Sequence, residues 1–357
     1  MYSNDIGIDM RYAFLCKNRG GKRGFIAIIG GGPAGLAATG YLSCMGYDVD
    51  VYDKLPYAGG LMMFAIPSYR IYPDNVIEGV EDLRDRMSVK FYLKTKVFAK
   101  GQSRYDEGDE FVENTIALEE LVEKYDAILI ATGTWNSRKL GIEGEDSKNV
   151  LTALEYLYHW RLYEEGLIQE KPIKGDKVVV IGAGLSAIDA AEKALEEGAE
   201  VYVAYRRTIA EAPAGIYTIN SLIREGVHFI ELVQPSKIIT SNNIATGIVF
   251  TKMRLGELDE TGRPKPIPIP GSDFEIDADL IILAVGEIPT PPFIDKFSSI
   301  SLDRSRRIIV NKFYQTNLDK VFAAGDVVIG PSFIGKAFSS GLRAAKYLDS
   351  FLTYRKM

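Results

Sequence analysis

The chain has 357 residues, of which 46% are hydrophobic and 25% are charged, and its formal net charge is −6. This length and composition suit a protein with a large buried core and about two domains. The negative net charge, without a polybasic cluster, argues against nucleic acid or an anionic membrane surface as the main partner. The sequence contains no run of 18 or more apolar residues, so we expect no membrane-spanning helix.

The first 24 residues are expected to form an N-terminal tail. They lack the apolar core of a secretory signal, which predicts a cytoplasmic protein. The chain has only two cysteines, Cys16 and Cys44, which excludes a disulfide-rich secreted scaffold.

The first predicted elements form a dinucleotide-binding fingerprint. An apolar run over 25–29, typical of a buried strand, leads into Gly30, Gly32 and Gly35 in G-x-G-x-x-G register. A helix and a second strand over 49–52 follow, and that strand ends at Asp53. In such a unit the glycines admit a pyrophosphate, the helix N-terminus offers it N–H groups, and the acid accepts hydrogen bonds from ribose hydroxyls. The alternative, glycines that serve only a tight turn, leaves the spacing of the acid unexplained.

Five further elements are predicted before the next fingerprint. Residues 56–76 read as a loop punctuated by Gly and Pro, in which Gly59 and Gly60 would let the backbone lie against a flat ring system. An amphipathic helix over 76–87 and a strand over 89–97 follow. A buried strand over 126–133 ends in a glycine turn, and 153–166 is predicted to be a helix.

A second fingerprint follows a buried strand over 177–181. Its G-x-G-x-x-A register consists of Gly182, Gly184 and Ala187. The position equivalent to Asp53 is Tyr205, and Arg206 and Arg207 come next. Two guanidinium groups can bind a 2′-phosphate that an acid would repel, so this unit favours NADPH over NADH. The alternative is a solvated arginine pair at the end of a strand.

The remainder of the chain changes pattern twice. Short strands and turns are expected from 231 to 284, with a polar, Pro-rich hairpin over 253–276. A buried strand over 279–286 mirrors the one at 126–133. The segment 319–348 predicts a strand, a Gly325–Asp326 turn, a loop and a last helix.

Taken together, the motifs GGGPAG, GGLMMFAIP, ATG, GAGLSA with YRR, AVG and AAGD resemble those of the two-dinucleotide-binding-domain flavoproteins. From 25 to about 352 the chain is most similar to the small subunit of glutamate synthase and the NADPH-oxidising half of dihydropyrimidine dehydrogenase. The resemblance implies an α/β fold with two Rossmann-like (ββα) dinucleotide-binding domains, the second inserted in the first. An FAD-binding domain would comprise 25–145 and 288–357, and an NAD(P)H-binding domain 146–287.

The resemblance also implies a function and its residues. The protein would pass electrons from a nicotinamide cofactor through FAD to a partner protein or a cluster, as a homodimer or in a hetero-oligomer. The residues implied for FAD are Gly30, Gly32, Pro33, Ala34, Gly35, Asp53, Lys54, Gly60, Leu61, Val97, Ala131, Thr132, Gly133, Gly325, Asp326, Lys336 and Ala337. Those implied for NADPH are Gly182, Gly184, Leu185, Ser186, Ala187, Arg206 and Arg207. The cofactors carry the chemistry, so no side-chain acid or base is required, and Lys336 is a candidate for tuning the flavin.

Two departures from these relatives are visible in the sequence. Their cysteine-rich N-terminal domain for iron–sulfur clusters is not expected, because only 24 residues with one cysteine precede the first strand. No C-x-x-C pair occurs, so a dithiol relay through this chain is not expected.

A second resemblance is to the flavin core of the heterodisulfide reductase flavoprotein and its short form in sulfur-oxidising prokaryotes. It implies an electron-transfer subunit of a sulfur-metabolising complex with little or no NAD(P)H activity. Cys16 and Cys44 would then be candidate iron–sulfur ligands, with one cluster shared by two chains. The alternative for Cys44 is a small buried residue on a helix, and for Cys16 a thiol in the tail.

Overall fold

The computed structural model describes residues 23–259, 262–294, 297 and 300–355. They divide into two compact units, one made of the chain up to 136 together with the chain from 287 onward, the other of 137–286. The chain passes between the units at strands β7 (Asn136–Ser137) and β17 (Glu287–Ile288).

The first unit is built on a five-stranded parallel sheet with the order β18-β6-β1-β2-β3. The strands are β1 (Phe25–Ile29), β2 (Asp48–Tyr52), β3 (Lys90–Tyr92), β6 (Ala127–Ile130) and β18 (Val321–Ala323). The middle strands β1 and β6 are almost fully buried, as their continuous apolar sequences predict. Because parallel strands end at the same edge, the turns after β1, β2, β6 and β18 gather there.

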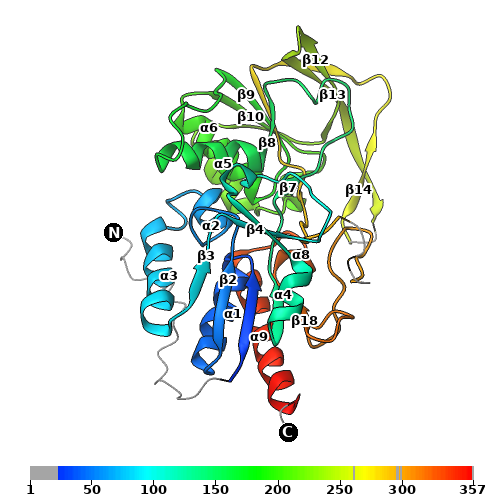
Figure 1. Ribbon diagram of the computed structural model, residues 1–357. Coiled ribbons are helices and arrows are strands. Elements are labelled where there is room, and N and C mark those ends of the chain that lie inside the picture. The colour runs from blue at the N-terminus through cyan, green and yellow to red at the C-terminus, as the bar shows by residue number, and fades with distance from the viewer. Residues whose placement is uncertain (1–22, 260–261, 295–296, 298–299, 356–357) are drawn as a thin grey trace. The chain divides into compact units, whose positions relative to one another are not determined.

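Helices cover this sheet, and two of them cross closely. They are α1 (Pro33–Cys44), α2 (Leu61–Phe64), α3 (Pro73–Met87), α4 (Leu118–Lys124), α8 (Asp326–Ile329), α9 (Ile334–Arg355) and the 3₁₀ turn η1 (Asp109–Phe111). Figure 1 shows α1 and α9 side by side. A Cβ at Gly341 would lie 2.0 Å from the carbonyl oxygen of Ala34, so only glycine permits this close crossing.

Three predicted elements of this unit differ from the structure, and one of them is the loop expected after Gly325, which begins with the short helix α8. The loop predicted over 56–76 contains the short helix α2. The strand predicted over 89–97 is two strands, β3 and β4 (Thr95–Phe98), because Lys94 has a φ of 50° and breaks the extended backbone. Strand β4 pairs instead with β5 (Asn114–Ala117) in a separate two-stranded parallel sheet.

The second unit has its own five-stranded parallel sheet, with the order β11-β10-β9-β16-β8. Its strands are β8 (Val150–Thr152), β9 (Lys177–Ile181), β10 (Glu200–Ala204), β11 (His228–Ile230) and β16 (Leu280–Leu283). Its helices are α5 (Ala153–Glu164), α6 (Leu185–Glu196), α7 (Ile216–Arg224) and the 3₁₀ turn η2 (Ile209–Glu211). A capping box between Thr152 and Glu155 starts α5 at the predicted place.

An antiparallel extension follows β11. It consists of β12 (Val233–Ser241), β13 (Ile244–Leu258), β14 (Pro264–Pro268) and β15 (Phe274–Asp277), with β12, β14 and β15 all paired to β13. The outer part of β13 and β14 is the predicted Pro-rich hairpin. Each of the two parallel sheets has a glycine turn after its middle strand, β1 or β9. This arrangement confirms the prediction of an α/β fold with two Rossmann-like domains.

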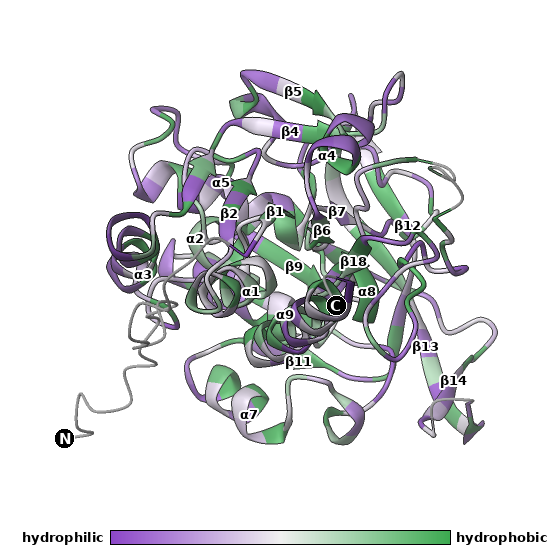
Figure 2. Cartoon of the chain, turned by 60° about the horizontal axis from the view of Figure 1, so that its bottom comes forward, coloured by the Kyte–Doolittle hydropathy of each residue, from purple (hydrophilic) through white to green (hydrophobic). Residues whose placement is uncertain are grey.

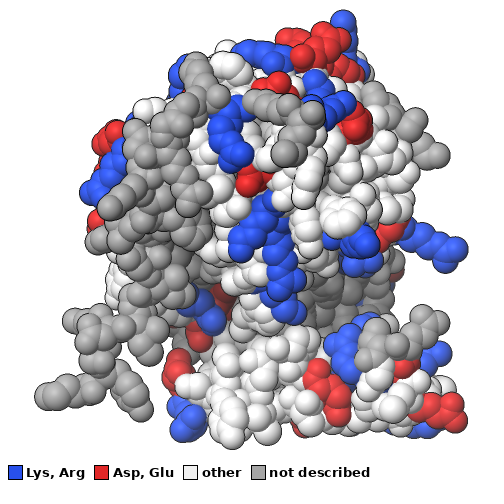
Figure 3. Space-filling view, turned by 90° about the horizontal axis from the view of Figure 1, so that it is seen from below, with Lys and Arg blue, Asp and Glu red and all other residues white. Residues whose placement is uncertain are grey.

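Hydropathy and charge follow this architecture. Figure 2 shows hydrophobic strands such as β9 and β18 and a largely hydrophilic α3. On the face drawn in Figure 3, basic and acidic side chains are interspersed. No helix among the described residues has the length and apolar character needed to cross a membrane.

Candidate functional site

The glycine turn after β1 contains two kinds of glycine. A Cβ at Gly30 would lie 2.4 Å from the carbonyl oxygen of Ala131, and one at Gly35 would lie 1.9 Å from the carbonyl oxygen of Gly30. The fold itself therefore requires both. Gly32 differs, because its φ of −77° suits any residue and a Cβ there would meet only the Cα of Gly60, at 3.9 Å. Among the described residues, no close contact requires glycine at this position, which leaves room for a ligand against the backbone here.

A pocket with an empty volume of about 650 Å³ opens at this turn, and we call it the glycine pocket. Thirteen predicted FAD residues line it: Gly30, Gly32, Pro33, Ala34, Asp53, Gly60, Leu61, Ala131, Thr132, Gly133, Gly325, Asp326 and Ala337. The remaining lining residues were not predicted: Met62, Ile66, Thr134, Trp135, Ser332, Phe333 and Ile334. Met62 and Thr134 directly adjoin predicted positions, and five of the seven are apolar, so an apolar residue close to a glycine turn is the signal that could have found part of this set.

Asp53 lies at the predicted place, at the end of β2, and is 7% exposed. The N–H of Gly31 donates to its Oδ2 at 2.6 Å, and the N–H of Leu55 donates to its Oδ1 at 2.9 Å. Burial raises the pKa of the Asp53 carboxyl, although these two hydrogen bonds and the nearby Lys54 oppose the shift. The side chain lines the glycine pocket and also a second pocket, so it sits where the two meet.

The second pocket has an empty volume of about 460 Å³, and we call it the charged pocket. Its lining residues are Ile29, Gly30, Tyr52, Asp53, Lys54, Thr95, Lys96, Val97, Phe98, Arg104, Asp106, Thr132, Trp135, Thr290 and Pro292. Lys54 and Val97, both predicted for FAD, line it. It shares Gly30, Asp53, Thr132 and Trp135 with the glycine pocket. The two pockets therefore adjoin at the ends of β1, β2 and β6 and offer an elongated site of the kind that a dinucleotide needs.

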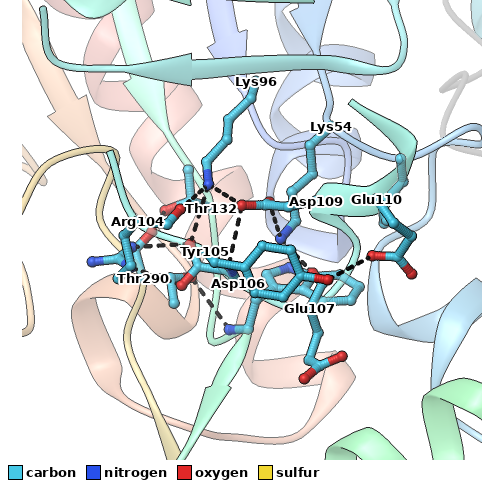
Figure 4. Close-up of polar contacts among 12 residues, drawn as sticks. Lys54, Lys96, Arg104, Tyr105, Asp106, Glu107, Asp109, Glu110, Thr132 and Thr290 are labelled. Atoms are coloured by element: carbon cyan, nitrogen blue, oxygen red, sulfur yellow. Dashed lines mark hydrogen bonds and ion pairs between the residues drawn. The ribbon is translucent and has the colours of Figure 1, made fainter. Parts of the chain in front are cut away.

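Lys54 and Lys96 both point toward Asp109 (Figure 4). The Nζ of Lys54 lies 3.1 Å from Oδ1 of Asp109, and it also donates to the backbone carbonyl of Glu107. The Nζ of Lys96 pairs with Oδ2 of the same carboxylate. Burial lowers the pKa of Lys54, while Asp109 and Asp106 oppose that shift. The Lys54 ammonium therefore holds the segment around Asp109 as a wall of the charged pocket, and its predicted direct contact with FAD stays a prediction.

Arg104 and Thr290 close the same wall. Arg104 binds both carboxylate oxygens of Asp106, with its Nε 2.7 Å from Oδ1, and donates to the carbonyl of Pro291 at 3.0 Å. The backbone carbonyl of Thr290 accepts from the hydroxyl of Thr132 at 2.6 Å. These contacts join three segments that are far apart in the sequence, as Figure 4 shows for the labelled residues.

Asp326 and Lys336 occupy different environments near the start of α9. Asp326 lines the glycine pocket and accepts hydrogen bonds from the hydroxyl of Ser332 at 2.6 Å and from its N–H at 3.2 Å. Burial raises the pKa of Asp326. Lys336 is exposed in the first turn of α9, with its Nζ 5.5 Å from the centre of the Phe333 ring. Lys336 is not among the described residues that line either pocket, whereas its neighbours Ile334 and Ala337 are.

The glycine turn after β9 contains the same two kinds of glycine as the turn after β1: one that the packing of the fold requires and one that it does not. A Cβ at Gly182 would lie 2.3 Å from the carbonyl oxygen of Ala284, so the fold requires this glycine. Gly184 has a φ of −87°, and a Cβ there would have no atom within 4 Å. The third small residue, Ala187, is fully buried in α6. Gly184 is thus the counterpart of Gly32, and it also faces a pocket.

That pocket has an empty volume of about 1290 Å³, and we call it the basic pocket. It lies within the second unit, and its charged lining residues are Arg138, Lys139, Arg206, Arg207 and Arg263. None of the described residues that line it is acidic. Of the residues predicted for NADPH, four line it: Gly182, Gly184, Arg206 and Arg207. Leu185, Ser186 and Ala187 belong to α6 and are not lining residues.

The structure separates the two arginines that the sequence analysis treated as a pair. Arg206 is exposed, whereas Arg207 is 2% exposed. The Nε of Arg207 donates to the carbonyl of Pro264 at 2.7 Å, and its Nη2 pairs with Oδ2 of Asp259 at 2.7 Å. Arg207 is therefore bound to the hairpin of β13 and β14. Arg206 is exposed and lines the basic pocket, and its predicted contact with NADPH stays a prediction.

Comparison with known proteins follows this geometry. A family model for pyridine nucleotide-disulphide oxidoreductases matches residues 25–341. The chain belongs to this family. It is thus an oxidoreductase of an FAD-binding pyridine nucleotide family, as the two glycine turns predict.

Two relatives and one solved structure illustrate the range of this pyridine nucleotide-disulphide oxidoreductase family. The chain is 33% identical to the NADP(+)-dependent formate dehydrogenase subunit beta of Moorella thermoacetica, over 92% of this chain and 44% of the relative. It is 32% identical to the glutamate synthase [NADPH] small chain of Halomonas elongata, over 92% and 68%. The structure of Mycobacterium tuberculosis FprA in complex with NADPH has a TM-score of 0.75 at 20% identity and matches 93% of this chain and 85% of FprA. The chain spans about half the length of the first curated relatives it matches.

The two cysteines bear on the disulphide chemistry that the family's description names, and Cys44 is disulfide-bonded in the structure. The sequence has no C-x-x-C pair. Cys44 is 4% exposed at the end of α1, and Cys16 lies outside the described residues. Within the described ranges, no group of three or more His, Cys, Asp or Glu side chains is arranged to hold a metal ion. Iron–sulfur ligation by Cys16 and Cys44 stays a prediction.

Proposed function

We propose that this protein is an FAD-dependent NAD(P)H oxidoreductase that accepts hydride from NADPH and passes electrons to a partner protein or a cluster. One observation carries the proposal. Each of the two Rossmann turns has a glycine, Gly32 or Gly184, whose Cβ would enter a pocket without meeting the protein closer than 3.9 Å. Two such positions in one chain support two bound dinucleotides.

FAD fits the first unit on the residues present. The N-terminal residues of α1, Pro33 and Ala34, line the glycine pocket, and the unpaired N–H groups at this helix end would donate to the pyrophosphate. Asp53 has lone pairs left for ribose hydroxyls after it has accepted from Gly31 and Leu55. Gly60, with a φ of 56° and a hypothetical Cβ 2.9 Å from the Cα of Gly32, keeps the next loop close against the turn. When bound, FAD would supply the conversion between hydride transfer and one-electron transfer.

NADPH fits the second unit because the basic pocket suits an additional phosphate. Arg206 follows β10, where NAD-specific Rossmann units place an acid for the ribose 2′-hydroxyl. An exposed guanidinium at this position can bind the 2′-phosphate through charge-assisted hydrogen bonds. The absence of acidic residues among the described lining residues removes the repulsion that would otherwise disfavour NADPH.

The electron acceptor is proposed from the relatives. The glutamate synthase relative is by name a small chain, and the formate dehydrogenase relative is by name one subunit of a larger enzyme. We propose that this chain likewise works with other subunits, either as a homodimer or in a hetero-oligomer, in the cytoplasm.

Anaerobic titration of the purified holoprotein tests this function. NADPH should bleach the flavin absorbance at about one equivalent per FAD, and NADH should do so only at higher concentration. A matched titration with dithionite shows that the flavin can be reduced. If dithionite bleaches the flavin and neither nucleotide does, the protein is instead an electron-transfer subunit of the heterodisulfide reductase type.

A further inference from the structure

The hairpin of β13 and β14 reaches the basic pocket through Arg263. This residue directly precedes β14, is half-buried and lines the pocket together with Arg206. No sequence motif marks it, because it is distant from both glycine turns in the chain.

Asp259 links the two arginines of the hairpin region. Its Oδ2 accepts from Arg207 at 2.7 Å, and its Oδ1 accepts from the N–H of Arg263 at 3.2 Å. Its own N–H donates to the carbonyl of Arg263 at 2.7 Å. Arg207 also donates to Pro264, the residue after Arg263, at 2.7 Å. The backbone on both sides of the Arg263 side chain is therefore tied to a buried guanidinium.

We propose that Arg263 contacts the 2′-phosphate of NADPH together with Arg206, and that Arg207 and Asp259 are positioning residues that hold Arg263 in place. The inference rests on the proposed function, since it assigns residues to the NADPH site. Arg207 is 2% exposed and bound to two oxygens, so little of its guanidinium is accessible to a nucleotide.

The pairing of Arg207 with Asp259 also explains how an acid is tolerated near a phosphate site. An unpaired Asp259 carboxylate would repel the two negative charges of a 2′-phosphate. Arg207 neutralises this carboxylate at 2.7 Å, while Asp259 in turn satisfies the buried cation. Arg206 and Arg263 are cations that line this side of the pocket, and a field of this sign favours a phosphorylated ribose.

Binding of NADP⁺ and NAD⁺ to the oxidised holoprotein, measured by calorimetry, tests this assignment without turnover. Arg206→Ala and Arg263→Ala should each weaken NADP⁺ binding by roughly 10- to 100-fold, the loss of a charge-assisted contact, and change NAD⁺ binding by less than about twofold. Arg263→Lys should retain part of the affinity because the charge remains. Arg254→Ala is the matched control, since Arg254 is an exposed cation on the same hairpin and is not among the residues that line the pocket.

A double-mutant cycle tests the positioning role. Asp259→Asn should weaken NADP⁺ binding by about 3- to 10-fold when Arg263 is present and have no further effect in an Arg263→Ala background, because it acts through that side chain. Additive losses would overturn the positioning role. Melting temperatures of all variants check that the second unit remains folded.

The outcomes separate this inference from the function on which it rests. If Arg206→Ala lowers the preference for NADP⁺ and Arg263→Ala leaves it unchanged, the role of Arg263 is refuted and the proposed function stands. If the unmodified holoprotein binds neither nucleotide, the proposed function fails, and the inference fails with it.

Discussion

Replacing Gly32 by valine isolates the contribution of one missing Cβ to flavin binding. The backbone at Gly32 has φ −77° and ψ −173°, an extended conformation that a β-branched residue adopts readily. Since a Cβ there would meet only the Cα of Gly60, at 3.9 Å, the valine side chain should project into the glycine pocket. Gly32 is also the N-cap of α1, so the exchange should cost the fold on the order of 1 kcal/mol.

The expected effect on FAD is much larger than the effect on the fold. Valine would exclude the pyrophosphate from the N–H groups of the first turn of α1. The loss of two charge-assisted hydrogen bonds, at about 1.5–3 kcal/mol each, weakens binding by roughly 100- to 10,000-fold. Gly32→Val should therefore purify without colour, while the unmodified protein purifies yellow with about one FAD per chain.

Visible flavin absorbance per chain is the assay, and Gly184→Val is the matched control. Gly184 has the same extended backbone, and a Cβ there would have no atom within 4 Å. This variant should keep its FAD and lose NADP⁺ binding. The melting temperature of Gly32→Val should lie only slightly below that of the unmodified apoprotein, because ligand-linked stabilisation is then absent from both and only the small N-cap cost separates them. A Gly32→Val protein with a full complement of flavin would refute the assignment of the glycine pocket to FAD.

Three further outcomes follow from the charges of the first unit. Burial raises the pKa of Asp53, so acidification should release FAD at a pH above the usual pKa range of aspartate. In a flavin-release assay, Asp53→Asn should make the release of FAD less dependent on pH. Acidification should have the opposite effect on the stability of the apoprotein. Near the raised pKa of Asp53 the folded apoprotein binds more protons than the unfolded chain. The free energy of unfolding, measured by urea titration, should therefore rise as the pH falls through that pKa. Asp109→Asn removes the carboxylate shared by two partly buried lysines and should cost about 1–3 kcal/mol of stability in urea titration, whereas Lys94→Met, which loses only the exposed pair with Glu113, should cost less than about 1 kcal/mol; equal losses would refute a structural role for the Asp109 cluster.

Local sequence patterns predicted the fold class and the two nucleotide turns. Each turn consists of a buried apolar strand, glycines at fixed spacing and a following helix, and this pattern lies within one short stretch of the sequence. Gly32, Gly184 and Asp53 therefore lie where the sequence places them, at the ends of β1, β9 and β2. The prediction of one strand over 89–97 was wrong for a local reason. Lys94 adopts a positive φ, which is uncommon for a residue other than glycine and which the sequence does not indicate.

The sequence by itself thus determined the α/β class, the two glycine turns and the expectation of a basic second site. Only the tertiary structure decided which charged side chains remain available to a ligand. Lys54 and Arg207 both follow strand ends that suggest nucleotide contact, yet Lys54 binds Asp109 and Arg207 binds Asp259. The partners come from segments that fold back over long stretches of chain, and a buried cation takes the nearest carboxylate that neutralises it. No local sequence pattern predicts these two ion pairs. For the same reason, Arg263 became a candidate phosphate ligand only when the structure showed that its hairpin reaches the basic pocket.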